Sequence, residues 1–259
     1  MLRRLSRLLL LMQSLVSKEL KVRYKRSVLG FFWFLLKPLF SMVVYTIVFT
    51  QIIRFGGEIR HFSLFLLTGL LPWNFFSGSL SASTKSLLDN HRLIRSVYFP
   101  RVSLPMANVA ANAVNLLLSL IVLETALIAF GHTPGFSLLV LPVAMLMFIL
   151  MTSGICMMLS VWNIYYRDVS QLMDVLLLAW FYASPVIYPL GRGIVPEGLE
   201  SVLRLNPLSG LMEIFHSILH QGAWPEPWCW ASLIVWSVVL FFLGIAVFRR
   251  AEPAVVKEL

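Results

Sequence analysis

The sequence has little charge and almost no cysteine. Only 13% of its 259 residues are charged, whereas 59% are hydrophobic, which excludes a soluble domain with an ordinary polar surface. The two cysteines, Cys156 and Cys229, fall in or beside different apolar runs near opposite ends of those runs, so we expect no disulfide. No lysine follows a glycine, so the P-loop motif is missing, and we expect no ATP hydrolysis by that route.

Patterns that support catalysis are also missing. No pair of carboxylates has an obvious acid–base spacing, and no loop concentrates acidic or metal-binding residues. We therefore predict no catalytic, cofactor-binding or metal site. This prediction weighs against one alternative, an intramembrane enzyme of glycan assembly, because such an enzyme needs a loop of that kind.

Six long apolar runs are present instead. A helix needs about 20 apolar residues to cross a bilayer. The candidate spans are residues 31–53, 62–83, 102–130, 137–162, 172–190 and 228–248. Too little chain lies between them for a separate soluble domain. The sequence therefore predicts an all-α polytopic membrane protein, with six transmembrane helices in a single domain over residues 1–259.

The positive charge is distributed unevenly among the segments between these runs. With the N-terminus in the cytosol, 16 of the 21 Lys and Arg residues fall in the two ends and the second and fourth loops. The positive-inside rule then predicts that both termini are cytosolic. The net charge of +9 thus indicates membrane orientation beside anionic lipids, and we expect no nucleic-acid partner.

Residues 1–28 have the pattern of a helix at the membrane surface. On a helical wheel Leu2, Leu5, Leu9, Met12, Val16 and Leu20 share one face, and Arg3, Arg7, Ser14, Lys18, Lys21 and Lys25 lie nearly opposite. The run at 8–12 is short and leads into charge, so we expect no cleavable signal peptide. Two interpretations stay open: a plain membrane anchor, or a cationic collar that also gathers an anionic lipid-linked substrate or contacts a cytosolic partner. In the second, Arg23, Lys25 and Arg26 could reach a phosphate or diphosphate.

Five blocks of sequence carry a family resemblance. They are KELKVRYKRSVLGFFWFLLKPLFSMVVYTIVF at 18–49, GLLPWNFFSGSLSASTKSLLDNHRLIRSVYFPR at 69–101, YYRDVSQLMDVLLLAWFYASPVIYP at 165–189, NPLSGLMEIF at 206–215 and FRRAEP at 248–253. Together they resemble ABC-2 type permeases that export polysaccharides and polyol phosphates. The resemblance implies the transmembrane permease subunit of an ABC exporter in the bacterial inner membrane.

The same resemblance implies partners and a substrate. They are a second copy of the permease, two copies of an ATPase subunit that bind ATP and Mg, and a polyprenyl-diphosphate-linked glycan. The excess of Arg over Lys, 15 to 6, suggests a GC-rich bacterial genome and favours O-antigen or capsule over teichoic acid. A passive membrane anchor for a glycan-assembly complex is a further alternative from a different class.

Residues 85–99 form a charged amphipathic segment on the predicted cytosolic side. Apolar side chains alternate with polar ones, and Pro100 ends the pattern. An ordinary solvated loop is one interpretation. In the resembled family this segment is the coupling helix that docks on the ATPase, which implies contact residues Leu88, Asp89, His91, Arg92, Arg95 and Tyr98.

Residues 191–227 are the largest segment predicted outside. Glycines and prolines interrupt it, while 198–205 and 208–219 have helical, one-sided apolar patterns. We predict a re-entrant helical hairpin, a structure that is tolerated only where protein or a water-filled cavity covers the backbone. In the resembled family this hairpin lines the outer exit of the channel.

Aromatic residues are the remaining candidates for substrate contact. Sugar rings stack weakly on aromatic side chains, which suits a sliding polymer. The predicted channel-lining residues are Trp33, Tyr45, Phe75, Phe76, Trp180 and Tyr182. The alternative is an aromatic belt at the membrane interface.

Overall fold

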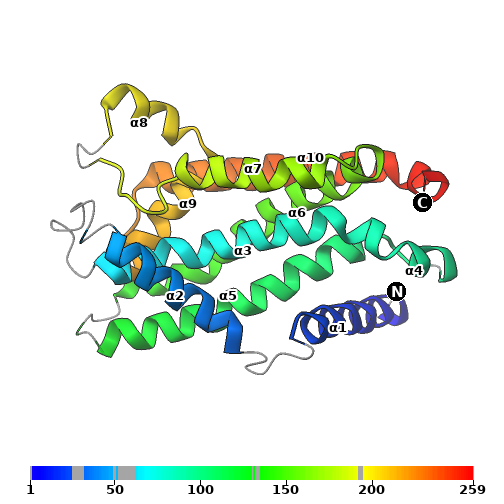
Figure 1. The fold of residues 1–259 in the computed structure, drawn as a ribbon, viewed down its shortest axis with the longest axis horizontal. Coiled ribbons are helices and arrows are strands. Elements are labelled where there is room, and N and C mark those ends of the chain that lie inside the picture. The colour runs from blue at the N-terminus through cyan, green and yellow to red at the C-terminus, as the bar shows by residue number, and fades with distance from the viewer. Residues whose placement is uncertain are drawn as a thin grey trace.

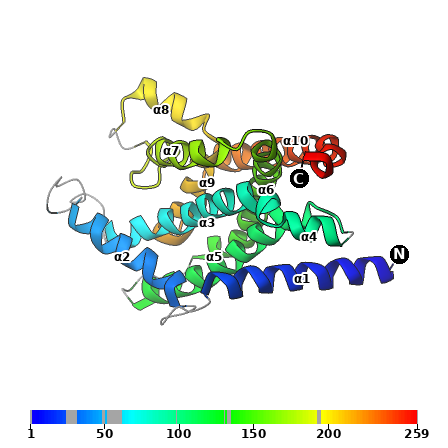
Figure 2. The same ribbon diagram turned by 45° about the vertical axis from the view of Figure 1, so that its right-hand side comes forward.

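The computed structural model describes residues 2–24, 32–48, 51, 62–97, 99–129, 131, 135–191 and 195–258, and every element in these ranges is helical. In chain order the elements are α1 (Leu2–Tyr24), α2 (Trp33–Ile47), α3 (Phe62–Asp89), α4 (His91–Ser96), α5 (Ser103–Ala129), η4 (Phe136–Val140), α6 (Leu141–Tyr165), α7 (Val169–Tyr182), α8 (Glu197–Arg204), α9 (Pro207–Phe215), η5 (His216–Gln221) and α10 (Pro227–Glu258). The long helices form an elongated bundle (Figure 1). One end carries α4 and both chain termini, and the other carries α8. We call them the termini end and the hairpin end (Figures 1 and 2).

Among the described residues, three helical stretches are long and apolar enough to cross a membrane. They are Ser103–Ala129, Phe136–Tyr165 and Pro227–Pro253. They match the third, fourth and sixth predicted spans, so these predictions are confirmed at the level of length and composition. The last helix continues beyond the predicted boundary at residue 248, because Arg, Ala and Glu in its extension are compatible with a helix.

The other predicted spans differ from the helices in their bounds. Helix α3 begins at Phe62 as predicted but continues to Asp89, because residues 80–88 contain no Gly or Pro. Helix α7 ends at Tyr182, before the predicted boundary at residue 190, since Pro185 disfavours helical backbone in the residue before it. Helix α2 covers only 33–47 of the predicted 31–53, and part of that range lies outside the described residues.

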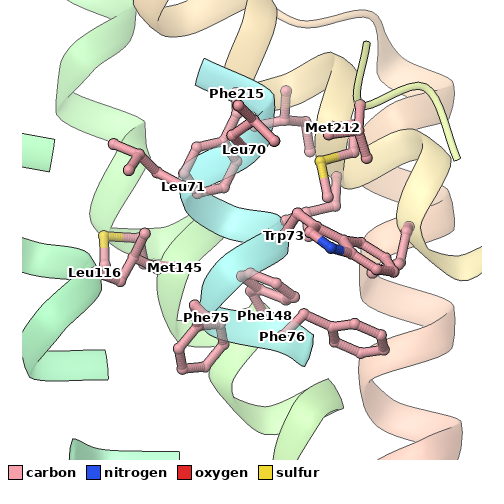
Figure 3. Packing of buried hydrophobic residues seen from close by; sticks show 14 of the residues in the cluster. Leu70, Leu71, Trp73, Phe75, Phe76, Leu116, Met145, Phe148, Met212 and Phe215 are labelled. Carbon is pink, nitrogen blue, oxygen red and sulfur yellow. The ribbon is translucent and has the colours of Figure 1, made fainter. Parts of the chain in front are cut away.

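Most buried apolar side chains form one cluster, which we call the main core. It draws on α3, α5, α6, α7, α9, η5 and α10. Figure 3 shows its aromatic centre, where Phe75 and Phe76 of α3 lie beside Phe148 of α6. The ring centroids of Phe75 and Phe148 are 4.8 Å apart, and those of Phe148 and Phe215 are 6.4 Å apart. Such edge-to-face contacts add to the stabilisation from burial alone.

Two glycines allow α6 and α10 to pack with their backbones in contact. A Cβ atom on Gly154 would collide with the carbonyl of Leu240, and one on Gly244 would collide with the carbonyl of Gly154. Nearby, the Ser237 hydroxyl donates a hydrogen bond to the Met147 carbonyl at 2.8 Å. Small residues and interhelical hydrogen bonds are the usual means by which helices associate in a membrane.

A second, smaller cluster lies at the termini end. Its buried members are Leu15, Leu87, Ile94, Leu104, Ala107, Met157, Val161, Ile164 and Phe248, and we call it the termini-end cluster. It joins α1, α3, α4, α5, α6 and α10. Helix α1 is foreshortened in Figure 1 and drawn out in Figure 2, so it crosses the long helices instead of running along them. Leu15, absent from the predicted apolar face of 1–28, is the residue that α1 buries in this cluster.

Candidate functional site: the coupling segment and its connections

The predicted coupling segment 85–99 is not one helix but the end of α3 followed by α4. Asn90 interrupts the helical path with φ −105° and ψ 20°. Its Nδ2 donates a hydrogen bond to the Ser86 carbonyl at 2.9 Å, which satisfies one of the acceptors left free at the end of α3. The segment is therefore broken into two helices at Asn90, which sequence periodicity did not predict.

The segment has a buried side and a charged side. Leu87 and Ile94 are buried in the termini-end cluster, and Leu88 is half-buried against it. The predicted contact residues Asp89, His91, Arg92 and Arg95 are all exposed. Tyr98 lies outside the described residues. The segment is thus anchored by apolar side chains and presents a charged surface at the end of the bundle.

Helix α1 contacts this segment at Asn90, between α3 and α4. The Lys18 Nζ donates a hydrogen bond to the Asn90 Oδ1 at 2.6 Å, and it lies 3.9 Å from the Glu19 carboxylate. Because Asn90 also holds the end of α3, the three elements α1, α3 and α4 meet at one side chain.

The C-terminal part of α10 reaches the other side of the segment. The Arg101 Nη1 donates a hydrogen bond to the Glu252 carbonyl at 3.0 Å and lies 4.0 Å from the Glu252 carboxylate. A cavity of about 200 Å³ lies beside it, lined by Ile94, Arg95, Ser96, Val97, Phe99 and Arg101. Polar contacts therefore join Asn90 to α1 and α3, and join Arg101, two residues after the segment, to α10.

The predicted headgroup residues fall at the limit of what the structure describes. Arg23 lies in the last turn of α1, and its side chain is outside the described part. Lys25 and Arg26 lie outside the described residues altogether. The substrate-headgroup assignment therefore stays a prediction.

The predicted channel-lining aromatics fall into two groups. Phe75 and Phe76 are buried in the main core, where they pack against other side chains and present no surface to a polymer (Figure 3). Trp33 and Tyr182 are 36% and 57% exposed, and Trp180 is half-buried. The side chain of Tyr45 lies outside the described part. Periodicity could not separate these groups, because the α3 aromatics face neighbouring helices and not the surface of the bundle.

The described part of 191–227 contains α8 and then α9 continued by η5, close to the predicted helical stretches 198–205 and 208–219, and α8 and α9 differ in burial. Helix α8 carries the exposed residues Leu199 and Val202, whereas α9 belongs to the main core. The structure describes 191 and 195–227 of this range, so we report these helices and leave the re-entrant arrangement as a prediction.

Asn206 connects the hairpin end to the end of α7. Its Oδ1 accepts hydrogen bonds from the Leu208 amide at 3.0 Å and the Trp180 Nε1 at 2.9 Å. Its Nδ2 donates to the Ala183 carbonyl at 2.8 Å and the Ser184 hydroxyl at 2.9 Å. The sequence signal was an Asn before a Pro at a helix start, which indicates a cap but not contacts 20 or more residues away.

No chemical centre emerges from these contacts. Within the ranges that the structure covers, no three His, Cys, Asp or Glu residues are grouped so as to hold a metal ion. The Glu213 Oε1 accepts a hydrogen bond from the Leu190 amide at 3.0 Å, and His216 stacks on Phe65 with centroids 4.1 Å apart. What the described residues show is a charged segment anchored by apolar side chains, with polar contacts from it and from the adjoining Arg101 to three helices.

Comparison with known proteins identifies the family. Residues 11–220 match the family described as ABC-2 type transporter. The chain is 36% identical over 247 residues to an O-antigen export system permease protein of Myxococcus xanthus, with 94% of each chain covered. It is 28% identical to a protein of the same name from Klebsiella pneumoniae, covering 92% of this chain and 90% of that protein. It is 25% identical to a polysialic acid transport protein of Escherichia coli, with 93% of each chain covered. On this match over most of its length, the chain belongs to the ABC-2 type transporter family.

Proposed function

We propose that this chain is the permease subunit of an ABC exporter that moves a lipid-linked polysaccharide, O-antigen, across the bacterial inner membrane. The observation that carries the proposal is the end-to-end similarity to an O-antigen export permease, at 36% identity over 94% of both chains. The energy would come from a separate ATPase subunit that binds ATP and Mg. This chain needs no cofactor of its own for such a role.

A topology of six spans with both termini in the cytosol fits the charge distribution. The termini and the charged α4 lie at the same end of the bundle, which is what the positive-inside rule requires of cytosolic segments (Figure 1). Helices α2 and α7, of 15 and 14 residues, are shorter than the roughly 20 residues of a full crossing.

A homodimer with two bound ATPase subunits is part of the proposal. Two short helices carry exposed apolar side chains: Val43, Val44 and Ile47 on α2, and Leu172, Val175, Leu176 and Leu178 on α7. Facing copies of these helices would form the channel wall, with exposed Trp33 and Tyr182 and also Tyr45 as candidate contacts for sugar rings. Phe75 and Phe76 would then pack in the main core and would not contact the polymer.

The proposed cycle begins with a polyprenyl-diphosphate-linked glycan in the inner leaflet. Its diphosphate would meet Arg23, in the last turn of α1, and Lys25 and Arg26, which follow in the sequence. Closure of the ATPase dimer would push the exposed residues of the coupling segment. Because that segment is linked to α1, α3 and α10 at Asn90 and Arg101, the push would move three helices together.

A capsule exporter is the second candidate within the same class. Relatives named for polysialic acid transport and for capsule polysaccharide export align over more than nine-tenths of both chains, at 25% and 20% identity. A teichoic acid exporter is a third substrate class. These candidates share the mechanism and differ in the glycan.

The test replaces one exposed charge of the coupling segment. Arg92→Glu reverses a charge at the surface of α4, and Arg250→Glu reverses an exposed charge on α10 outside the segment. We expect Arg92→Glu to abolish both surface polysaccharide and co-purification of the ATPase while the protein still inserts, and Arg250→Glu to retain both. Normal export and co-purification with Arg92→Glu would contradict the coupling assignment. Intact coupling with a non-glycan substrate would contradict the polysaccharide assignment and favour a different exporter.

A further inference from the structure

An apolar groove opens on the side of the bundle towards the hairpin end. It lies between α5, η4, α6 and η5 and has a volume of about 490 Å³. Leu120, Leu141, Met145 and Leu219 form a buried floor. Leu117, Ile121 and Leu146 form a rim that is about half exposed or more. The groove is therefore a lateral opening in the helical wall and not an internal cavity.

One ionisable side chain lines this groove. Glu124 of α5 has a buried Oε2, and among the residues that the structure describes no group gives this oxygen a hydrogen bond. Glu124 precedes the end of α5 at Ala129 by five residues, or about 7–8 Å along the helix. A carboxyl group at that depth is costly in hydrocarbon unless it is paired.

The surroundings of the groove point to a lipid as the missing partner. Exposed Ile121, Val122 and Ile128 on α5 and Val143 on α6 give the adjoining surface the character of a bilayer contact. An occupant that enters from the bilayer needs an apolar part for the floor and a cation with hydrogen-bond donors for Glu124. An anionic phospholipid would place like charges together, and a quaternary ammonium has no N–H to donate.

We propose that this groove binds one phosphatidylethanolamine-type phospholipid from the leaflet at the hairpin end. Its primary ammonium group donates to the Glu124 carboxylate, and part of an acyl chain lies along Leu120, Leu141 and Met145. The bound lipid supplies the polar partner that the described chain does not provide, and it fills the space between α5 and α6. The site is separate from the coupling segment and does not depend on the identity of the exported glycan.

The test measures lipid retention and not transport. The complex is reconstituted in vesicles of phosphatidylethanolamine and phosphatidylglycerol, extracted in mild detergent, and analysed by native mass spectrometry. We expect about one retained phosphatidylethanolamine per permease. Glu124→Gln should reduce this retention at least fivefold, whereas Glu226→Gln, the same change at an exposed carboxylate on the hairpin side, should leave it unchanged. Equal retention in wild type and Glu124→Gln would overturn the proposal.

A second pair of variants tests the apolar part of the site. Ile121→Trp places a large side chain on the rim of the groove, and Ile128→Trp places the same side chain on an exposed position of α5 outside it. Only Ile121→Trp should lower retention. Because both positions are exposed, neither variant should prevent folding, which size-exclusion chromatography verifies.

Two further outcomes would exclude the proposed occupant. If phosphatidylcholine is retained as well as phosphatidylethanolamine, an N–H donor is not required and the proposal fails. If Ile121→Cys forms a disulfide between permease copies in the membrane, a second copy covers the groove and the lipid assignment is wrong. Failure of any of these tests leaves the export proposal intact, since that proposal rests on the similarity to export permeases and its own test is made in the coupling segment.

Discussion

The main core and the termini-end cluster are built from different interactions. In the main core, aromatic rings pack edge to face, and beside it α6 and α10 touch backbone to backbone at Gly154. At the termini end a smaller cluster is bordered by polar contacts at the surface, such as Lys18–Asn90 and Arg101–Glu252. Backbone contact and dense packing resist rearrangement, whereas exposed ion pairs are weak and exchange readily with water. We infer that the main core is stiffer than the termini end, which would let the termini end move if an ATPase subunit acts on it.

The largest expected effect comes from truncating the aromatic centre. Phe76 is 0% exposed, so Phe76→Ala should lower the free energy of unfolding by about 3–5 kcal/mol through lost burial and a cavity. Tyr182→Ala, at a 57% exposed position, should change stability by less than about 0.5 kcal/mol. Thermal unfolding in detergent measures both.

The variants Phe76→Ala and Tyr182→Ala also test whether Tyr182 belongs to the channel wall. If Tyr182 contacts the polymer, Tyr182→Ala should reduce surface polysaccharide at unchanged stability. A Phe76→Ala protein as stable as wild type would contradict the description of the main core as tightly packed.

A smaller effect is expected at the crossing of α6 and α10. Gly154→Ala adds a methyl group that meets the Leu240 carbonyl, and the resulting backbone shift should cost about 1–3 kcal/mol. Gly198→Ala adds the same group on α8 where no atom lies within 4 Å, and should stabilise the helix by up to about 1 kcal/mol. A lower melting temperature for Gly154→Ala and a higher one for Gly198→Ala would support a rigid contact between α6 and α10. Equal shifts would mean that α6 and α10 can move apart to accommodate the added methyl group.

The smallest effect on stability is expected at the termini end. Arg101→Gln removes an ion pair whose side chains are 19% and 38% exposed, so the cost should stay below about 1 kcal/mol. We expect this variant to export less polymer per ATP hydrolysed, because α10 is no longer tied to the coupling segment. Glu252→Gln is the milder control, since the Glu252 carbonyl still accepts the Arg101 hydrogen bond. A stability loss as large as that of Gly154→Ala would contradict the contrast between the two regions.

Local signals in the sequence located several elements well. The apolar runs at 102–130, 137–162 and 228–248 correspond to α5, to η4 with α6, and to the first part of α10. A run of about 20 apolar residues favours a helix in a bilayer because the helix satisfies its own backbone hydrogen bonds. The start of α3 at Phe62 and the charged exposure of Asp89, His91, Arg92 and Arg95 also followed from pattern alone.

Other features were not predicted, some because a local signal was overlooked and some because they depend on how the helices pack. The break at Asn90 sits inside a segment whose periodicity reads as continuous, and the early end of α7 follows from a proline within an apolar run. Aromatic residues at 75 and 76 were indistinguishable by type from those at 33 and 182, yet the first pair is buried and the second exposed. The orientation of each helix within the bundle determines which aromatic side chains are buried, and residue composition does not predict that orientation.

By itself, the sequence determined that this chain is a helical membrane protein, because its apolar runs exceed what a soluble surface could tolerate. It also indicated which segment carries the exposed charge. Only the tertiary structure decided which aromatic side chains are buried. It also decided that Leu15 of α1 packs in the termini-end cluster, and that Arg101 contacts Glu252, 151 residues further along the chain. Hydrophobicity and helix propensity act within a few turns of one residue, whereas these contacts exist only after several helices have packed together.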